Sequence, residues 1–230
     1  MADDGSSYGG SGSKKSKKKL AKPAQDVRDL PAGTKNINFD WDDVLGVIRE
    51  VMDQGNRRTC STIASTRSLS ARLIAEKRFD PPLCLSALHV LVGLIDRHVS
   101  MFKVEDLIIQ EKVNERELIC LVNKGPVAVS IDVHSEFTNF QGDGIYPGPK
   151  KKRAKIDKHL LLVRGYGTKM PEGIHYWKVQ NSAGHKWGDK GLGKIVRQIS
   201  RGKNEPSLFT CIVYPTLLDH YEGERIRQHA

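Results

Sequence analysis

The chain has 230 residues and a mass of 25.7 kDa, enough for one large domain or two small lobes with a core of their own. Its hydrophobic share of 38 % and its 21 glycines are ordinary for a folded protein, which excludes a fully disordered or fibrous chain. The net charge of +10 is concentrated in residues 1–22 and 149–158 and leaves the rest of the chain close to neutral, which excludes an extended basic binding face.

The predicted elements change character along the chain. Residues 1–36 consist largely of Gly, Ser, Lys and Pro and predict a disordered tail. Apolar spacing predicts helices in the first half, over residues 61–77, 85–99 and 105–123. Alternating β-branched residues predict strands in the second half, over residues 126–133, 159–167, 175–181 and 208–215. A helical half followed by a strand-rich half indicates an α+β fold.

The sequence features that indicate a cell compartment favour an intracellular location. The first residues lack the apolar segment of a secretory signal, and the longest apolar stretch, Leu83 to Ile95, is shorter than the roughly 20 residues of a membrane span. The four cysteines have no metal-site spacing and predict free thiols in a reducing compartment. We therefore expect an intracellular protein, cytoplasmic or nuclear, with no membrane contact, no metal and no cofactor.

The basic run at 149–155 contains four consecutive cations and is typical of nuclear import signals: Lys150, Lys151, Lys152 and Arg153. An import receptor is therefore a candidate partner, and a solvated surface loop is the alternative. Neither this run nor the lysine run at 14–19 contains an aromatic residue, so nucleic-acid binding is not expected.

One cysteine has the surroundings of a nucleophile. Cys60 follows the polar turn Gln54-Gly55-Asn56 and opens the first predicted helix. Unpaired N–H groups and the helix dipole favour the thiolate there, and the thiolate is the attacking species in thiol catalysis. Taken alone, however, a free cysteine is more often a small buried hydrophobic residue.

Four blocks of residues place Cys60 in a larger pattern. In chain order they are Asp40-Trp41 with Gln54-Gly55 and Cys60; Gly125-Pro126-Val127-Ala128-Val129 with Gly144-Ile145-Tyr146; His159 six residues before Gly165-Tyr166-Gly167; and Tyr176-Trp177 with Asn181-Ser182-Ala183-Gly184 and Trp187-Gly188. Over about residues 39 to 215 this order resembles that of the papain-like cysteine peptidases. Four ordered blocks are far more specific than one short motif.

The resemblance implies both a fold and a set of roles. The fold would be two-lobed, with a mainly helical lobe at 37–124, an antiparallel β-barrel-like lobe at 125–215, a cleft between them and a C-terminal tail at 216–230. Cys60 would be the nucleophile, His159 its base and Asn181 the residue that orients the imidazole. Gln54 would complete the oxyanion hole with the backbone N–H of Cys60, and Trp187 would lie beside the site. The implied partner is a polypeptide substrate or peptide ligand.

Several departures from the family pattern lie around these residues. Ser61 and Ala183 each replace a tryptophan, and the one missing at 183 normally covers the contact between the asparagine and the histidine. Arg58 replaces a glycine. His159 follows Cys60 by 99 residues, where roughly 130 or more are usual, so one wall of the substrate groove is expected to be deleted. The alternative to an active peptidase is therefore a catalytically silent papain-fold protein that binds peptides or proteins.

Overall fold

The computed structural model describes residues 38–41, 50–76, 85–87, 105–150, 157–202 and 204–217. Its strands are β1 (Phe39–Asp40), β2 (Asp106–Glu111), β3 (Val127–Val133), β4 (Ile145–Tyr146), β5 (Asp157–Lys169), β6 (Ile174–Gln180), β7 (Leu192–Val196) and β8 (Phe209–Thr216). Its helices are α2 (Cys60–Ala75), α4 (Glu115–Lys124), α5 (Ser135–Thr138) and α6 (Gln198–Arg201). The division into tails and two lobes extends beyond these residues and stays a prediction.

The described strands form one sheet of eight strands in the order β2-β8-β3-β5-β6-β7-β4, with β1 paired to β5. All of the pairs are antiparallel except that of β4 with β7. The mixed α+β content is as expected, but the sheet does not close into a barrel, because among the described strands β2 and β4 remain at its two ends.

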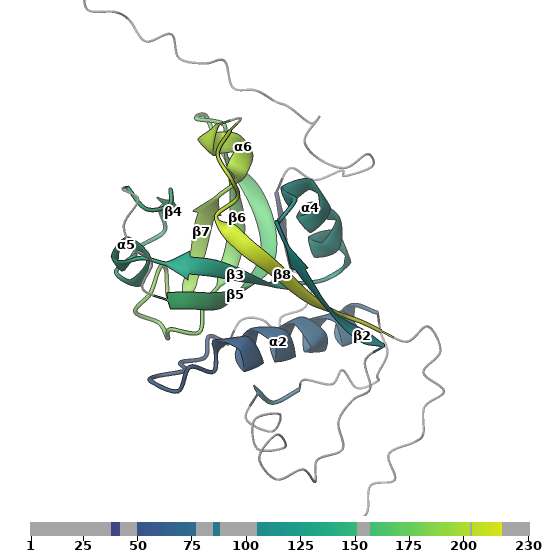
Figure 1. Cartoon of the computed structure of the whole chain (residues 1–230). Helices are drawn as coiled ribbons and strands as arrows, with labels where there is room; N and C mark the ends of the chain where they lie inside the picture. Colours follow the sequence, from purple (N-terminus) through teal and green to yellow (C-terminus); the bar gives the residue numbers. More distant parts are fainter. Residues whose placement is uncertain are drawn as a thin grey trace, which may run out of the picture.

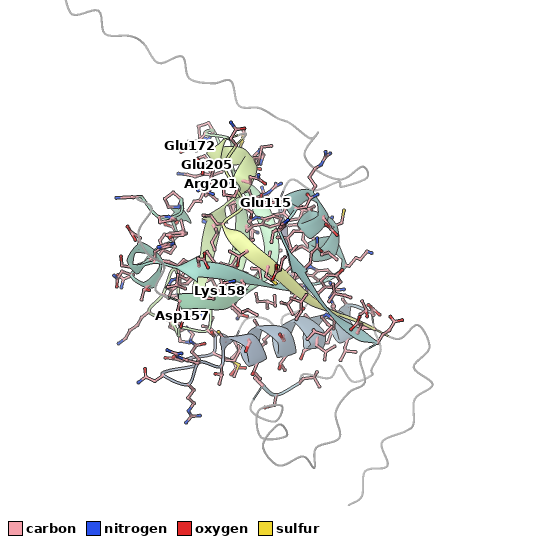
Figure 2. The ribbon with its side chains drawn as sticks, in the orientation of Figure 1. Glu115, Asp157, Lys158, Glu172, Arg201 and Glu205 are labelled. Atoms are coloured by element: carbon pink, nitrogen blue, oxygen red, sulfur yellow. The ribbon has the colours of Figure 1, made fainter. Side chains whose placement is uncertain are left out.

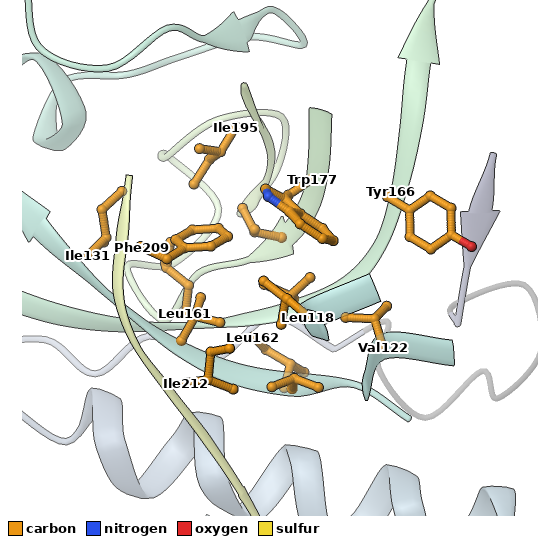
Figure 3. Packing of buried hydrophobic residues seen from close by; sticks show 14 of the residues in the cluster. Leu118, Val122, Ile131, Leu161, Leu162, Tyr166, Trp177, Ile195, Phe209 and Ile212 are labelled. Atoms are coloured by element: carbon orange, nitrogen blue, oxygen red, sulfur yellow. The ribbon is translucent and has the colours of Figure 1, made fainter. Parts of the chain in front are cut away.

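The core lies between the sheet and α4. Figure 3 shows Trp177 of β6, Phe209 of β8 and Leu118 of α4 pointing toward one another, and all three are almost fully buried. Strand β3 contributes consecutive buried residues, and α2 packs against it. The catalytic candidates His159 and Asn181 lie on or directly after the neighbouring strands β5 and β6.

Helix α2 covers the other face of the sheet and packs against β5, β3 and β8 (Figure 1). The sequence predicted this helix over 61–77 despite a weak apolar stripe, and the structure explains the weakness. Thr66, Arg67 and Arg72 are buried although they are polar. Arg67 is paired with Glu50 at 3.2 Å, and the guanidinium of Arg72 lies over the ring of Tyr214. On the buried face of α2, Arg67 is therefore engaged in an ion pair and Arg72 in a cation–π contact.

The prediction of a helix over 105–123 is wrong for its first half. Residues Asp106–Glu111 form β2, which pairs with β8, and the helix α4 begins only at Glu115. The side chain of Asn114 accepts a hydrogen bond from the N–H of Arg116 at 3.0 Å, so Asn114 caps the helix and separates it from the strand. The apolar pattern of β2 was misread because short apolar runs fit either period.

The remaining predicted elements have the following outcomes. The four predicted strands are confirmed as β3, β5, β6 and β8. The helix predicted over 85–99 lies outside the described residues except for positions 85–87. Within the part of the chain that is described, no helix is long and apolar enough to cross a membrane.

Candidate active site

Cys60 is presented by a tight polar turn that leads into α2. Gly55 has a φ of +52°, and its N–H binds the carboxylate of Asp53 at 2.8 Å. The N–H of Arg57 donates to the carbonyl of Gln54 at 3.1 Å, which closes the turn. The next residues lead directly into the helix, so the Cys60 thiol lies at its N-terminus and is only partly buried.

His159 and Asn181 come from neighbouring strands. His159 lies near the start of β5, and Asn181 directly follows β6, whose last residue, Gln180, pairs with Leu162 of β5. His159 Nε2 lies 2.7 Å from Asn181 Oδ1. The backbone N–H of Ser182 donates to the same oxygen at 2.7 Å.

These two contacts assign the histidine tautomer. An amide oxygen only accepts hydrogen bonds, so Nε2 of His159 carries the proton that Asn181 Oδ1 accepts. The Ser182 N–H donates to the same Asn181 atom, which must therefore be an acceptor, so the oxygen of the Asn181 amide faces His159. The other ring nitrogen, Nδ1, is then the one available to the Cys60 thiol, to which the imidazole is hydrogen-bonded.

The pKa values of Cys60 and His159 are shifted in opposite directions. The hydrogen bond from His159 lowers the pKa of Cys60, and backbone amides of Leu160 and Ser61 act in the same direction against partial burial. Burial alone would lower the pKa of His159, but the hydrogen bonds to Cys60 and Asn181 and the negative charges of Cys60 and Asp157 outweigh it and raise that pKa. Opposite shifts in the two pKa values favour a thiolate beside an imidazolium.

Gln54 is held by Ser182, the neighbour of Asn181, to which the sequence analysis gave no role. Ser182 donates its hydroxyl hydrogen to Gln54 Oε1 at 2.9 Å, and the Gln54 N–H donates to the Ser182 carbonyl at 2.8 Å. With its oxygen engaged by Ser182, the side-chain amide of Gln54 keeps its NH₂ group for another acceptor. The only signal for Ser182 in the sequence is its place next to Asn181 in the fourth block.

The other predicted neighbours, Ser61, Ala183 and Trp187, differ in their exposure. Ser61 and Ala183 are both exposed, and Ala183 forms an isolated bridge with Asp53. Trp187 is buried, packs against Phe137 and donates its indole N–H to the Phe137 carbonyl at 2.7 Å. The described ring contacts of Trp187 are with Phe137 and Phe140.

Arg58, in the turn before α2, has an unusual backbone conformation. It has a φ of +51°, in the left-handed region that side chains other than glycine rarely occupy. The sequence comparison with the family placed a glycine here, and the backbone has kept the conformation that a glycine would favour. Arg57 and Arg58 are both exposed next to Cys60.

The model of the papain family of cysteine proteases matches residues 96–216, more than half of the chain. This chain belongs to that family. The match includes His159 and Asn181 and begins after Cys60.

Curated members of the family match parts of this chain. A cathepsin L-like peptidase from Aedes aegypti is 39 % identical over 95 residues, which cover 41 % of this chain and 26 % of the relative. Cathepsin 7 from Mus musculus is 36 % identical over 121 residues, or 51 % of this chain and 35 % of the relative. The chain thus matches about a third or less of the length of these two relatives.

Solved structures of the family have the same fold. Bromelain protease from Ananas comosus, in complex with the E64 inhibitor, superposes with a TM-score of 0.63 at 21 % identity, over 80 % of this chain and all of that one. A cysteine protease from Carica candamarcensis gives a TM-score of 0.60 at 21 % identity, over 79 % of this chain and 99 % of that one. The papain-like fold expected from the sequence is confirmed.

Proposed function

We propose that the protein hydrolyses peptide bonds, with Cys60 as the nucleophile and His159 as the general acid and base. The observation that carries the proposal is the hydrogen-bonded series from Cys60 through His159 to Asn181, in which the last contact is 2.7 Å long. The opposite shifts in the pKa values of Cys60 and His159 support it, because they favour the reactive ion pair over two neutral groups.

The reaction follows from these positions. The Cys60 thiolate would attack the carbonyl carbon of the scissile bond, and the carbonyl oxygen would take the negative charge. The backbone N–H of Cys60 and the NH₂ group of Gln54 would stabilise that oxyanion, and Ser182 holds the Gln54 amide in place. As the intermediate collapses, the C–N bond breaks and His159 gives a proton to the leaving amine.

A thioester on Cys60 would then remain. His159, now neutral, would take a proton from water while the water oxygen attacks the thioester carbonyl. The C–S bond breaks, the acid product leaves, and the thiolate and imidazolium form again. The hydrogen bond to Asn181 keeps the ring of His159 in the same tautomer through both steps.

Turnover of a fluorogenic peptide amide tests this proposal. The unchanged chain should release the fluorophore, and Cys60→Ser and His159→Ala should each abolish release. Cys120→Ser is the matched control, because Cys120 is an exposed thiol on α4. An unchanged chain without turnover that still binds peptide would instead support the catalytically silent alternative.

A further inference from the structure

Two arginines lie on the turn that presents Cys60. Arg57 and Arg58 are both exposed, and within the described residues neither side chain makes an ion pair or a hydrogen bond. The backbone of the turn is closed, because the N–H of Arg57 donates to the Gln54 carbonyl at 3.1 Å. Two exposed arginines are by themselves ordinary solvated surface. What distinguishes these two is their position relative to the reacting groups.

The turn connects the two donors of the proposed oxyanion hole. Gln54 lies at its start and Cys60 at its end. A substrate carbonyl has to place its oxygen between the NH₂ group of Gln54 and the N–H of Cys60, and its carbon next to the Cys60 thiolate. The substrate residue that supplies this carbonyl therefore lies beside the turn. The Cα atoms of Arg58 and Cys60 are two peptide units apart, at most about 7.6 Å, which an extended arginine side chain can span.

The carboxylate on the same turn is already engaged by the backbone. Oδ1 of Asp53 accepts the N–H of Gly55 at 2.8 Å. Oδ2 of Asp53 lies so close to Gly184 that a Cβ atom on this glycine would be 2.7 Å from it. Residues 53–60 thus carry two arginines against one carboxylate, and the described contacts of that carboxylate are with neither arginine.

A second carboxylate near the catalytic pair is also engaged. Figure 2 labels Asp157 and Lys158 at the start of β5. Asp157 Oδ1 accepts the N–H of Lys158 at 2.8 Å, and the charge of Asp157 acts on the imidazole of His159. Lys158 lies on the opposite face of β5 from these two residues, because successive side chains of a strand alternate. Asp157 is therefore matched by the imidazolium, which leaves the guanidinium groups of the turn available to a ligand.

We propose that Arg57 and Arg58 select peptide substrates in which the residue that supplies the scissile carbonyl is Asp or Glu. A guanidinium group binds a carboxylate through two parallel N–H···O bonds, a geometry that the neutral amide of Gln or Asn does not match. The distance from the turn to the reacting carbonyl is also within the screening length of about 8–10 Å at ordinary ionic strength. This inference rests on the proposed function and names its substrate class.

Two isomeric alkylating peptides test the selection without requiring turnover. They are acetyl-Gln-Ala-Glu chloromethyl ketone and acetyl-Glu-Ala-Gln chloromethyl ketone, which have the same net charge. Only in the first does the residue that bears the ketone carry the carboxylate. The Cys60 thiolate attacks the chloromethyl carbon, the C–S bond forms, the C–Cl bond breaks and chloride leaves. Mass spectrometry gives the second-order rate constant at Cys60 for each peptide. Their ratio is independent of the thiolate fraction, because both peptides react with the same thiolate.

In the unchanged chain at low salt, the first peptide should react about fivefold faster than the second, and added NaCl should reduce this ratio. Arg57→Gln and Arg58→Gln should each lower the ratio, and the double variant should bring it close to one. Glutamine keeps the left-handed backbone at position 58, so the comparison isolates the charge. Arg116→Gln is the matched control, because Arg116 is an exposed arginine on α4, across the sheet from α2, and its loss should leave the ratio unchanged.

Two results would overturn the selection alone: a ratio of one in the unchanged chain, or a ratio that the double variant leaves unchanged while Cys60 still reacts faster than Cys120. Reaction of Cys60 no faster than Cys120 with both peptides would instead contradict the proposed function, and the selection with it. The two failures are therefore distinguished in the same experiment, since Cys120 is an exposed thiol of the same chain.

Discussion

Ser182 links Gln54 to the residue that holds His159, and its hydroxyl donates to Gln54 Oε1 at 2.9 Å. The backbone N–H of the same serine donates to Asn181 Oδ1 at 2.7 Å. One buried residue therefore holds both Gln54, the proposed oxyanion donor, and the oxygen of Asn181 that accepts from His159. Replacing its side chain separates the two effects, because only the bond to Gln54 uses the hydroxyl.

We expect Ser182→Ala to lower kcat/KM for a peptide amide by about tenfold, the effect of one lost positioning hydrogen bond. Gln54→Ala removes the oxyanion donor itself and should cost about 10²–10³ in kcat. Neither change should slow alkylation of Cys60 by iodoacetamide, since that reaction forms no oxyanion. A parallel loss of alkylation would show that Ser182 acts on the thiolate and not on the oxyanion hole.

Cys60 should be alkylated faster than Cys120 and Cys211 at pH 6. Its pKa is lowered by His159, whereas burial raises the pKa of Cys211. A thiol with a lowered pKa stays ionised to lower pH, so the rate profile of Cys60 should rise at lower pH than that of Cys211. Asn181→Ala removes a bond that raises the pKa of His159, and should shift the Cys60 profile to higher pH. Mapping the modified cysteine by mass spectrometry at each pH gives the profiles, and equal rates at the three thiols would contradict the assignment.

Ala183→Trp should raise kcat/KM for a peptide amide by up to about tenfold. Ala183 is exposed and follows Ser182 at the turn that holds Asn181. A tryptophan there would shield the contact between His159 and Asn181 from water and strengthen it. His185→Trp adds the same side chain at an exposed position two residues further on and is the control. An unchanged rate in a folded Ala183→Trp variant would place the limit on turnover elsewhere in the cleft.

Much of the proposed site could be predicted from the sequence because its residues occur in blocks that keep their order and their internal pattern, although the distance from Cys60 to His159 is short. The role of Ser182 could not be predicted in this way, since its bonds to Gln54 and Asn181 depend on how β6 ends beside the turn before α2. In the fold, β2 was mistaken for part of a helix because its short apolar run fits both periods. Strand β7 was missed because Gly193 interrupts its apolar pattern.

The left-handed backbone conformation of Arg58 predicts how a substitution there changes the free energy of unfolding. An L side chain in this region costs roughly 1–2 kcal/mol, and glycine removes that cost while adding freedom to the unfolded chain. Arg58→Gly should therefore raise the free energy of unfolding by up to about 1 kcal/mol. Arg57→Gly removes the same charge next to Cys60 without relieving strain, and should be neutral or destabilising by about 0.5 kcal/mol. Urea midpoints measure both, and destabilisation by Arg58→Gly would show that the arginine makes compensating contacts.

Trapping of the covalent intermediate tests the central claim most directly. The chain is mixed with a peptide p-nitrophenyl ester, quenched in acid within milliseconds, digested and analysed by mass spectrometry. The mechanism predicts an acyl group as a thioester on Cys60, present in Ser182→Ala as well and absent in His159→Ala. An acyl group on Cys120 or Cys211, or ester hydrolysis with Cys60 unmodified at every time, would contradict the assignment of Cys60 as the nucleophile.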